Sequence, residues 1–140
     1  MILSELMSFK NPHKEEVFVR FFKTRKGEYG EGDVFLGLSV PITRKIALKH
    51  RDLSINEIQK LLNNKHHECR LAALMILVDQ YRCGDKKKKK EIFNFYLKNT
   101  KNINNWDLVD LSVYHIVGDN LLKNNRKILY KLAKSKNLWE

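Results

Sequence analysis

The segment Leu71–Val78 constrains the fold most strongly, because eight consecutive residues in it are apolar. It lies within the longer run HHECRLAALMILVDQYRC (residues 66–83), whose apolar residues cover almost every side of a helix. Such a segment is too short to span a bilayer. A helix that is apolar nearly all round is buried on several sides. We therefore expect residues 66–83 to form a central helix surrounded by other elements.

The remainder of the chain also has a helical pattern. Apolar residues recur at spacings of three and four, and the period-two alternation of half-buried strands is absent. Only six glycines and two prolines interrupt the 140 residues. Besides the central helix, we expect helices at residues 15–24, 41–50, 54–64, 85–100, 102–117 and from 125 to a short break near Ser135, after which another helix opens.

Several helix ends carry local signals. Ser54 and Glu57 have the spacing of a capping box, and Asp85 is an expected N-cap for the helix that follows. Pro41 is expected at the first helical position, where its missing N–H costs nothing. Gly118 is expected to end the helix that begins near Asn102, as a C-cap glycine.

The first expected helix, residues 15–24, is predicted to pack on the body of the protein. Its predicted inner residues are Val17, Phe18, Phe21 and Phe22. The segment that follows, residues 26–39, contains four of the six glycines and is expected to be an ordered loop. Tyr29 and Phe35 are the residues expected to pack this loop against the helices.

The helices group into units of about 35–45 residues, a length typical of helical repeats. The units begin near Pro41, His66 and Asn102, and they are not close copies of one another. We predict an all-α fold, a right-handed α-solenoid of HEAT-like helical repeats, as one domain over residues 1–140. A compact helical bundle is the main competing fold on pattern alone.

The chain is strongly basic along its whole length. It carries 27 Lys and Arg against 16 Asp and Glu, a formal net charge of +11, and each third of the chain is positive. This distribution is typical of a protein that lies along a polyanion such as nucleic acid. A basic surface that serves only solubility is the alternative. The run Lys86–Lys90 is accordingly either a solvated corner or a set of phosphate contacts.

Other site classes have little support. The start of the chain acquires charge within a few residues and lacks the layout of a signal peptide, so we expect a cytoplasmic protein, associated with the nucleoid if bacterial. Cys69 and Cys83 lie about 20 Å apart at helical rise and cannot form a disulfide with each other. His66 and His67 beside Cys69 have no second ligand cluster, so no metal site is expected.

Trp106 and Asp110 form the one combination that suggests chemistry. They are four residues apart and share one side of a predicted helix. A tryptophan here is most often core, and an aspartate one turn later is most often surface or a partner for a loop. Asp107 and Asp110 lie on different faces of a helix rich in apolar residues, so at least one of them should be buried, with a partner or a purpose. His115, on the same helix, is expected to be structural.

Four segments of the chain resemble one known family. Residues 21–50, 67–81, 103–121 and 132–140 closely resemble the DNA alkylation repair enzymes, the HEAT-like-repeat DNA glycosylases, in the same order and spacing. The resemblance implies a curved solenoid whose basic concave face holds duplex DNA. It implies removal of purines alkylated at N3 or N7, without a metal or organic cofactor and without extruding the base.

The resemblance also implies the site residues. The segment WDLVD matches the family at Trp106, which would pack against the sugar of the damaged nucleotide. It also matches at Asp110, which would stabilise the cationic sugar and position water. The expected DNA-contacting residues are Ser39, Arg44, Lys45 and Lys101.

Members of the family continue beyond the segment LWE with arginine residues and further repeats. We therefore expect this chain to correspond to the N-terminal two-thirds of a family member, and a second chain that supplies the missing repeats stays open. One alternative function is a non-catalytic DNA-binding module. A protein-binding HEAT adaptor is a further alternative, which the lysine content disfavours because protein interfaces are depleted in lysine.

Overall fold

The computed structural model describes all 140 residues and is helical, with one isolated bridge between Val34 and His66 as its only extended pairing. The α-helices are α1 (Ile2–Ser8), α2 (Pro12–Phe21), α3 (Val40–Lys49), α4 (Ile55–Leu62), α5 (His67–Cys83), α6 (Lys86–Lys98), α7 (Trp106–Val113), α8 (Asp119–Leu122) and α9 (Lys127–Leu132). A 3-10 turn, Thr100–Asn102, precedes α7, and a π-helical segment, Tyr114–Gly118, joins α7 to α8. The predicted all-α class is confirmed.

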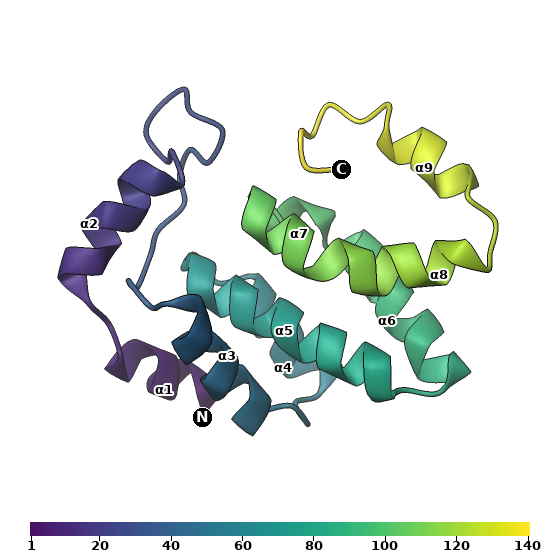
Figure 1. Cartoon of the computed structure of the whole chain (residues 1–140), viewed down its shortest axis with the longest axis horizontal. Helices are drawn as coiled ribbons and strands as arrows, with labels where there is room; N and C mark the ends of the chain where they lie inside the picture. Colours follow the sequence, from purple (N-terminus) through teal and green to yellow (C-terminus); the bar gives the residue numbers. More distant parts are fainter.

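Helix α5 lies at the centre of the molecule, as predicted. Every residue of Leu71–Val78 is buried. Helices α3 and α7 flank α5, while α4 and α6 also pack on it and lie behind the front layer in Figure 1. The successive pairs α3–α4 and α5–α6 are consistent with the predicted helical repeats.

Two of the predicted helix caps are present in the structure. Ser54 and Glu57 form the capping box of α4, with both reciprocal hydrogen bonds present. The Asp85 side chain accepts a hydrogen bond from the Lys88 N–H at 2.8 Å and caps α6. Helix α3 begins one residue earlier than predicted, at Val40, so Pro41 is its second residue.

The N-terminal region differs from the prediction in two ways. Helix α1 was not predicted, yet it buries Ile2 and Leu6, which are one helical turn apart, and it packs on α3 and α5. Helix α2 buries no residue, so the expectation that Val17 and Phe21 face inward is wrong: they are 60% and 61% exposed. The side of α2 that carries Phe18, together with Phe22 just after the helix, instead packs against Phe35 of the following loop.

The loop between α2 and α3 is ordered and packs against the helices, as predicted. Phe35 is buried and stacks on Phe22 with ring centroids 5.0 Å apart. Gly37 has φ +79°, and a Cβ there would lie 2.2 Å from the Asn11 carbonyl oxygen. The glycine therefore lets this loop pass directly over the start of α2. Tyr29 remains partly exposed and contacts Trp139.

The C-terminal part differs from the prediction at Gly118. This residue has φ −58°, a helical value, and the chain continues through it into α8 as far as Leu122, so the predicted C-cap is wrong. Packing explains the continuation, because the residues on either side, Val117 and Leu121, are buried. No second helix opens after Ser135, where the chain forms turns. No helix in the structure combines the length and the apolar character needed to cross a membrane.

Candidate functional site

Trp106 lies at the first position of α7 with one face of its ring packed. The buried Asn105 precedes it, and the Asn105 side chain accepts a hydrogen bond from the Trp106 N–H at 2.8 Å. The indole stacks on Phe22 with centroids 5.5 Å apart and planes at 22°, and the edge of Phe21 is 6.0 Å away. The residue is nevertheless 37% exposed. Trp106 is therefore a ring held in place at the surface rather than a core residue.

Asp110 lies one turn further along α7, on the side of the helix that Trp106 shares. It is exposed, and its carboxylate makes no hydrogen bond or ion pair within the protein. The structure thus places an unpartnered carboxylate and a partly exposed aromatic ring on the same exposed side of α7. This arrangement can receive a ligand that carries positive charge.

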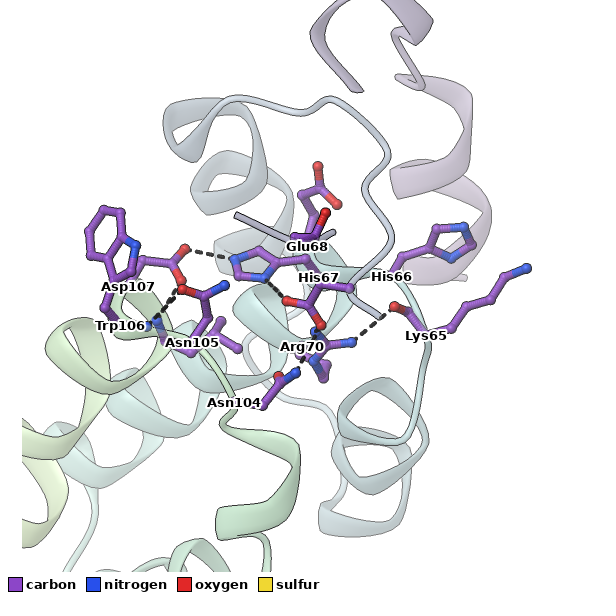
Figure 2. Close-up of polar contacts among 12 residues, drawn as sticks. Lys65, His66, His67, Glu68, Arg70, Asn104, Asn105, Trp106 and Asp107 are labelled. Carbon is purple, nitrogen blue, oxygen red and sulfur yellow. Dashed lines mark hydrogen bonds and ion pairs between the residues drawn. The ribbon is translucent and has the colours of Figure 1, made fainter. Parts of the chain in front are cut away.

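Asp107 is the aspartate of this helix that has a protein partner. Its carboxylate lies 2.7 Å from Nε2 of His67, a buried residue at the start of α5. The other ring nitrogen of His67, Nδ1, lies 3.0 Å from the carboxylate of Asp33, in the loop before α3. The imidazole therefore joins the beginnings of α5 and α7 to this loop, and Figure 2 shows it beside Asp107.

Asp33 receives further donors. The Arg70 guanidinium donates to it at 2.5 Å and the Asn104 amide at 2.9 Å, and both side chains lie near His67 in Figure 2. Burial alone would raise the pKa of Asp33, but the hydrogen bond to His67 and the Arg70 charge lower it below its usual value. Asp33 is therefore held as a carboxylate inside the protein.

The same contacts act on His67 with the opposite sign. Burial alone would lower the pKa of His67, but the hydrogen bonds to Asp107 and Asp33 outweigh it and the pKa is raised. A protonated imidazole donates through both nitrogens, which suits a position between two carboxylates. These contacts favour the protonated form of His67, which links two helices and a loop.

Glu68 holds the loop before α3 in place through hydrogen bonds to its backbone. Its buried carboxylate accepts hydrogen bonds from the backbone N–H groups of Leu36, Gly37 and Leu38 at 2.8, 2.9 and 3.1 Å. Buried charge is stable here because each oxygen has donors. Together with His67, Glu68 makes the start of α5 the anchor for the elements around Trp106.

Sequence reasoning missed the network of Asp33, His67, Arg70 and Asp107. The signal that could have found it is a set of charged residues, His67, Glu68 and Arg70, at the start of the helix that contains the longest apolar run in the chain. Charged groups at a position this buried need partners elsewhere. No group of three or more His, Cys, Asp or Glu side chains is arranged to hold a metal ion, and the cysteines are free, Cys69 buried and Cys83 exposed.

The expected DNA-contacting residues lie on two segments. Arg44 and Lys45 are exposed on α3, and Ser39 is the partly buried N-cap residue of that helix. Lys101 is exposed in the 3-10 turn before α7. No hydrogen bond or ion pair links any of them to Trp106 or Asp110. Their contact with DNA stays a prediction.

One comparison identifies the chain. Residues 2–140 match the profile of the family described as DNA alkylation repair enzyme. The chain belongs to the DNA alkylation repair enzyme family. The match includes α1, α2 and the C-terminal turns as well as the segments that carry the sequence resemblance. No curated protein and no solved structure matches the chain.

Membership of the DNA alkylation repair enzyme family assigns the chain to DNA repair and gives its substrate a connection to DNA. In that setting, an exposed and unpartnered carboxylate on the same helix side as an exposed aromatic ring suits a cationic part of a DNA substrate, whereas a carboxylate alone would only repel phosphate. The exposed side of α7 with Trp106 and Asp110 is therefore the candidate site.

Proposed function

We propose that this chain is a DNA glycosylase that hydrolyses the N-glycosidic bond of purines alkylated at N3 or N7 in duplex DNA. The observation that carries the proposal is the carboxylate of Asp110, exposed and unpartnered on the same helix side as the Trp106 ring. Membership of the DNA alkylation repair enzyme family supports it.

The proposed chemistry requires little from the protein beyond charge placement. Alkylation at N3 or N7 makes the purine cationic, so the base can leave with the bonding electron pair and become neutral without a general acid. Positive charge then develops on the deoxyribose. A carboxylate and the electron-rich face of an indole both stabilise that charge when they are already in position. Water adds to the anomeric carbon, and its proton passes to the Asp110 carboxylate or to solvent.

The packing around Trp106 supports the required rigidity. Phe22 stacks beneath the indole, and the hydrogen bond between Asp107 and His67 fixes the first turn of α7. An electrostatic group stabilises a transition state best when it needs no rearrangement during the reaction. In this proposal His67 and Asp107 position the helix, and Asp110 touches the reacting sugar.

The test is base release from duplex DNA containing 7-methylguanine, compared between the wild-type chain and Asp110→Asn. We expect release to fall by roughly 100-fold, the scale of losing one electrostatic stabiliser. The melting temperature should not change, because the Asp110 side chain has no partner in the protein. Asp52→Asn is the matched control, since Asp52 is also exposed and unpartnered but lies after α3.

Two results would count against the assignment. Equal release by wild type and Asp110→Asn would exclude the proposed role of Asp110. If the wild-type chain releases no base but binds duplex DNA with a steep salt dependence, the non-catalytic DNA-binding function is supported instead.

A further inference from the structure

A second surface feature lies at the other end of α5 from His67. Two adjoining hollows, of about 850 and 500 Å³, share Tyr81, Lys89 and Asp119 among their lining residues. Their lining residues come from the end of α5, the start of α6, the π-helical segment and the region of α8. Helices α6 and α8 contact each other and lie at the right of Figure 1. We call this feature the lysine groove. Its basic lining residues are Arg82, Lys86, Lys89, Lys90 and Lys123.

The run of five lysines is divided between this groove and open solvent. Lys86, Lys89 and Lys90 line the groove, whereas Lys87 and Lys88 do not. Residues three and four apart share a helix face, so α6 turns these three toward the hollow. Lys88 instead pairs with Glu91 at 3.3 Å. The lysine run is therefore not a uniformly solvated corner.

The acidic lining residues, Asp85 and Asp119, offset only part of the positive charge of the groove. Asp85 uses its carboxylate to cap α6, and Asp119 accepts a hydrogen bond from the Tyr81 hydroxyl at 3.1 Å and lies 4.0 Å from Lys89. The other basic lining residues form no ion pair within the protein: Arg82, Lys86, Lys90 and Lys123. Three unpaired cations around the larger hollow, with Arg82 at the adjoining smaller one, suit a ligand with several negative charges.

The groove continues the exposed side of α7. Asp119 follows Asp110 by nine residues along one continuous helical path, which corresponds to about 14 Å at helical rise. Between them, Tyr114 is 74% exposed and lines the smaller hollow. A single duplex that meets Asp110 can therefore pass over this side of the protein to the groove.

We propose that the lysine groove binds the sugar–phosphate backbone of the duplex that carries the lesion, about four base pairs from the nucleotide at Asp110, given about 3.4 Å between successive base pairs. Lysine ammonium groups recognise phosphate as point charges and do not read base sequence. The placement relative to the lesion rests on the proposed function. The binding of the backbone itself does not.

The charge test compares two double variants that remove the same charge from the same helix. Lys86→Gln with Lys90→Gln removes two positive charges that line the groove, and Lys87→Gln with Lys88→Gln removes two that do not. Affinity for an undamaged duplex of about 20 base pairs is measured between low and physiological salt. For the groove variant we expect at least about tenfold weaker binding and a salt slope reduced by roughly 1.8, since each phosphate contact contributes about 0.9.

The control variant should keep nearly the wild-type salt slope. Equal slopes in the two double variants would overturn the proposal, because the position of the charge would then not matter. Binding to anionic vesicles that depends on Lys86 and Lys90, together with equal slopes on DNA, would assign the groove to a membrane surface instead. Neither measurement requires base release, so both are independent of the role of Asp110.

The position test uses the thiol of Cys83, which is exposed next to Arg82. Burial raises the pKa of Cys69 to about 12, so a thiol reagent labels Cys83 selectively. With an iron chelate on Cys83 and an abasic-site analogue in the duplex, we expect one cluster of backbone cuts about four base pairs from the analogue. Uniform cutting would overturn the placement even if the charge test succeeds.

Discussion

The two ends of helix α5 treat charge in opposite ways. At the N-terminal end, His67, Glu68 and Arg70 are buried. Their partners lie in the loop before α3, in the turn before α5 and at the start of α7. At the C-terminal end, Arg82 and the unpaired lysines of the groove are exposed and have no acidic partner. The first arrangement fixes elements relative to one another, and the second leaves charge available to another molecule.

This difference predicts that substitutions at the two ends affect different measurements. A buried charge that loses its partner destabilises the fold, because its desolvation is no longer compensated. An exposed unpaired charge contributes little to the fold, so its loss is detected in binding. The change in stability should therefore be largest in the buried network around Asp33 and smallest in the lysine groove.

Asp33→Ala should have the largest effect. It leaves the Arg70 guanidinium and the His67 imidazole buried without their shared carboxylate, and breaking a buried pair costs about 3–5 kcal/mol. The free energy of unfolding, measured by denaturant titration, should fall by about 3 kcal/mol or more. Asp79→Ala, which breaks the exposed pair with Arg51, should cost less than about 1 kcal/mol. Similar losses in the two variants would contradict the contrast.

A pH titration should show an intermediate effect. His67 has a raised pKa in the folded protein, so its stabilising contribution is complete below its ordinary pKa of 6.5 and is lost as pH rises through the folded-state pKa. His66 acts in the opposite sense, because burial lowers its pKa. The difference in unfolding free energy between wild type and His67→Gln isolates the contribution of His67 and should shrink with rising pH.

Asp33 makes the free energy of unfolding depend on pH in the acidic range as well. The lowered pKa of Asp33 means that its contribution to stability is present above the ordinary value of 3.8 and is lost as pH falls through the folded-state pKa.

For His67, a stability difference between wild type and His67→Gln that stays constant from pH 6 to pH 9 would contradict a charged imidazole.

The smallest effect on stability should come from the lysine groove. Lys86→Gln with Lys90→Gln removes no ion pair, so the free energy of unfolding should stay within about 0.5 kcal/mol of the wild-type value, as is usual for surface changes. A slight gain would agree with relief of like-charge repulsion. A loss of more than about 1 kcal/mol, measured by denaturant titration, would indicate a structural role for these lysines.

The sequence predicted the parts of the fold that depend on neighbouring residues. The buried character of Leu71–Val78 and the capping box at Ser54 are read from short segments, and the structure contains both. The inner face of α2 was not predictable in this way. Apolar spacing indicates a helix but does not say which of its apolar sides docks, and here packing through Phe18 and Phe22 leaves Val17 exposed.

For the candidate site, the sequence pointed to Trp106 and Asp110 but not to the residues that hold them. His67 meets Asp33 across 34 residues and Asp107 across 40. Pairing over such separations depends on how the helices pack, and no local spacing encodes it. The lysine run was visible in the sequence, but its division into groove and solvent faces required the position of α8.

The π-helical segment Tyr114–Gly118 lies inside one long helical path and determines how the faces of α7 and α8 are rotated relative to each other. A π-turn closes its hydrogen bond over five residues where an α-turn uses four, so it holds one extra residue. That residue rotates every later side chain by about 100° around the helix axis. Deleting it would leave Trp106 and Asp110 in place but would turn Asp119 away from Tyr81. Single-residue insertions and deletions at this turn therefore offer evolution a route to exchange the lining of the groove while the aromatic–carboxylate pair is retained.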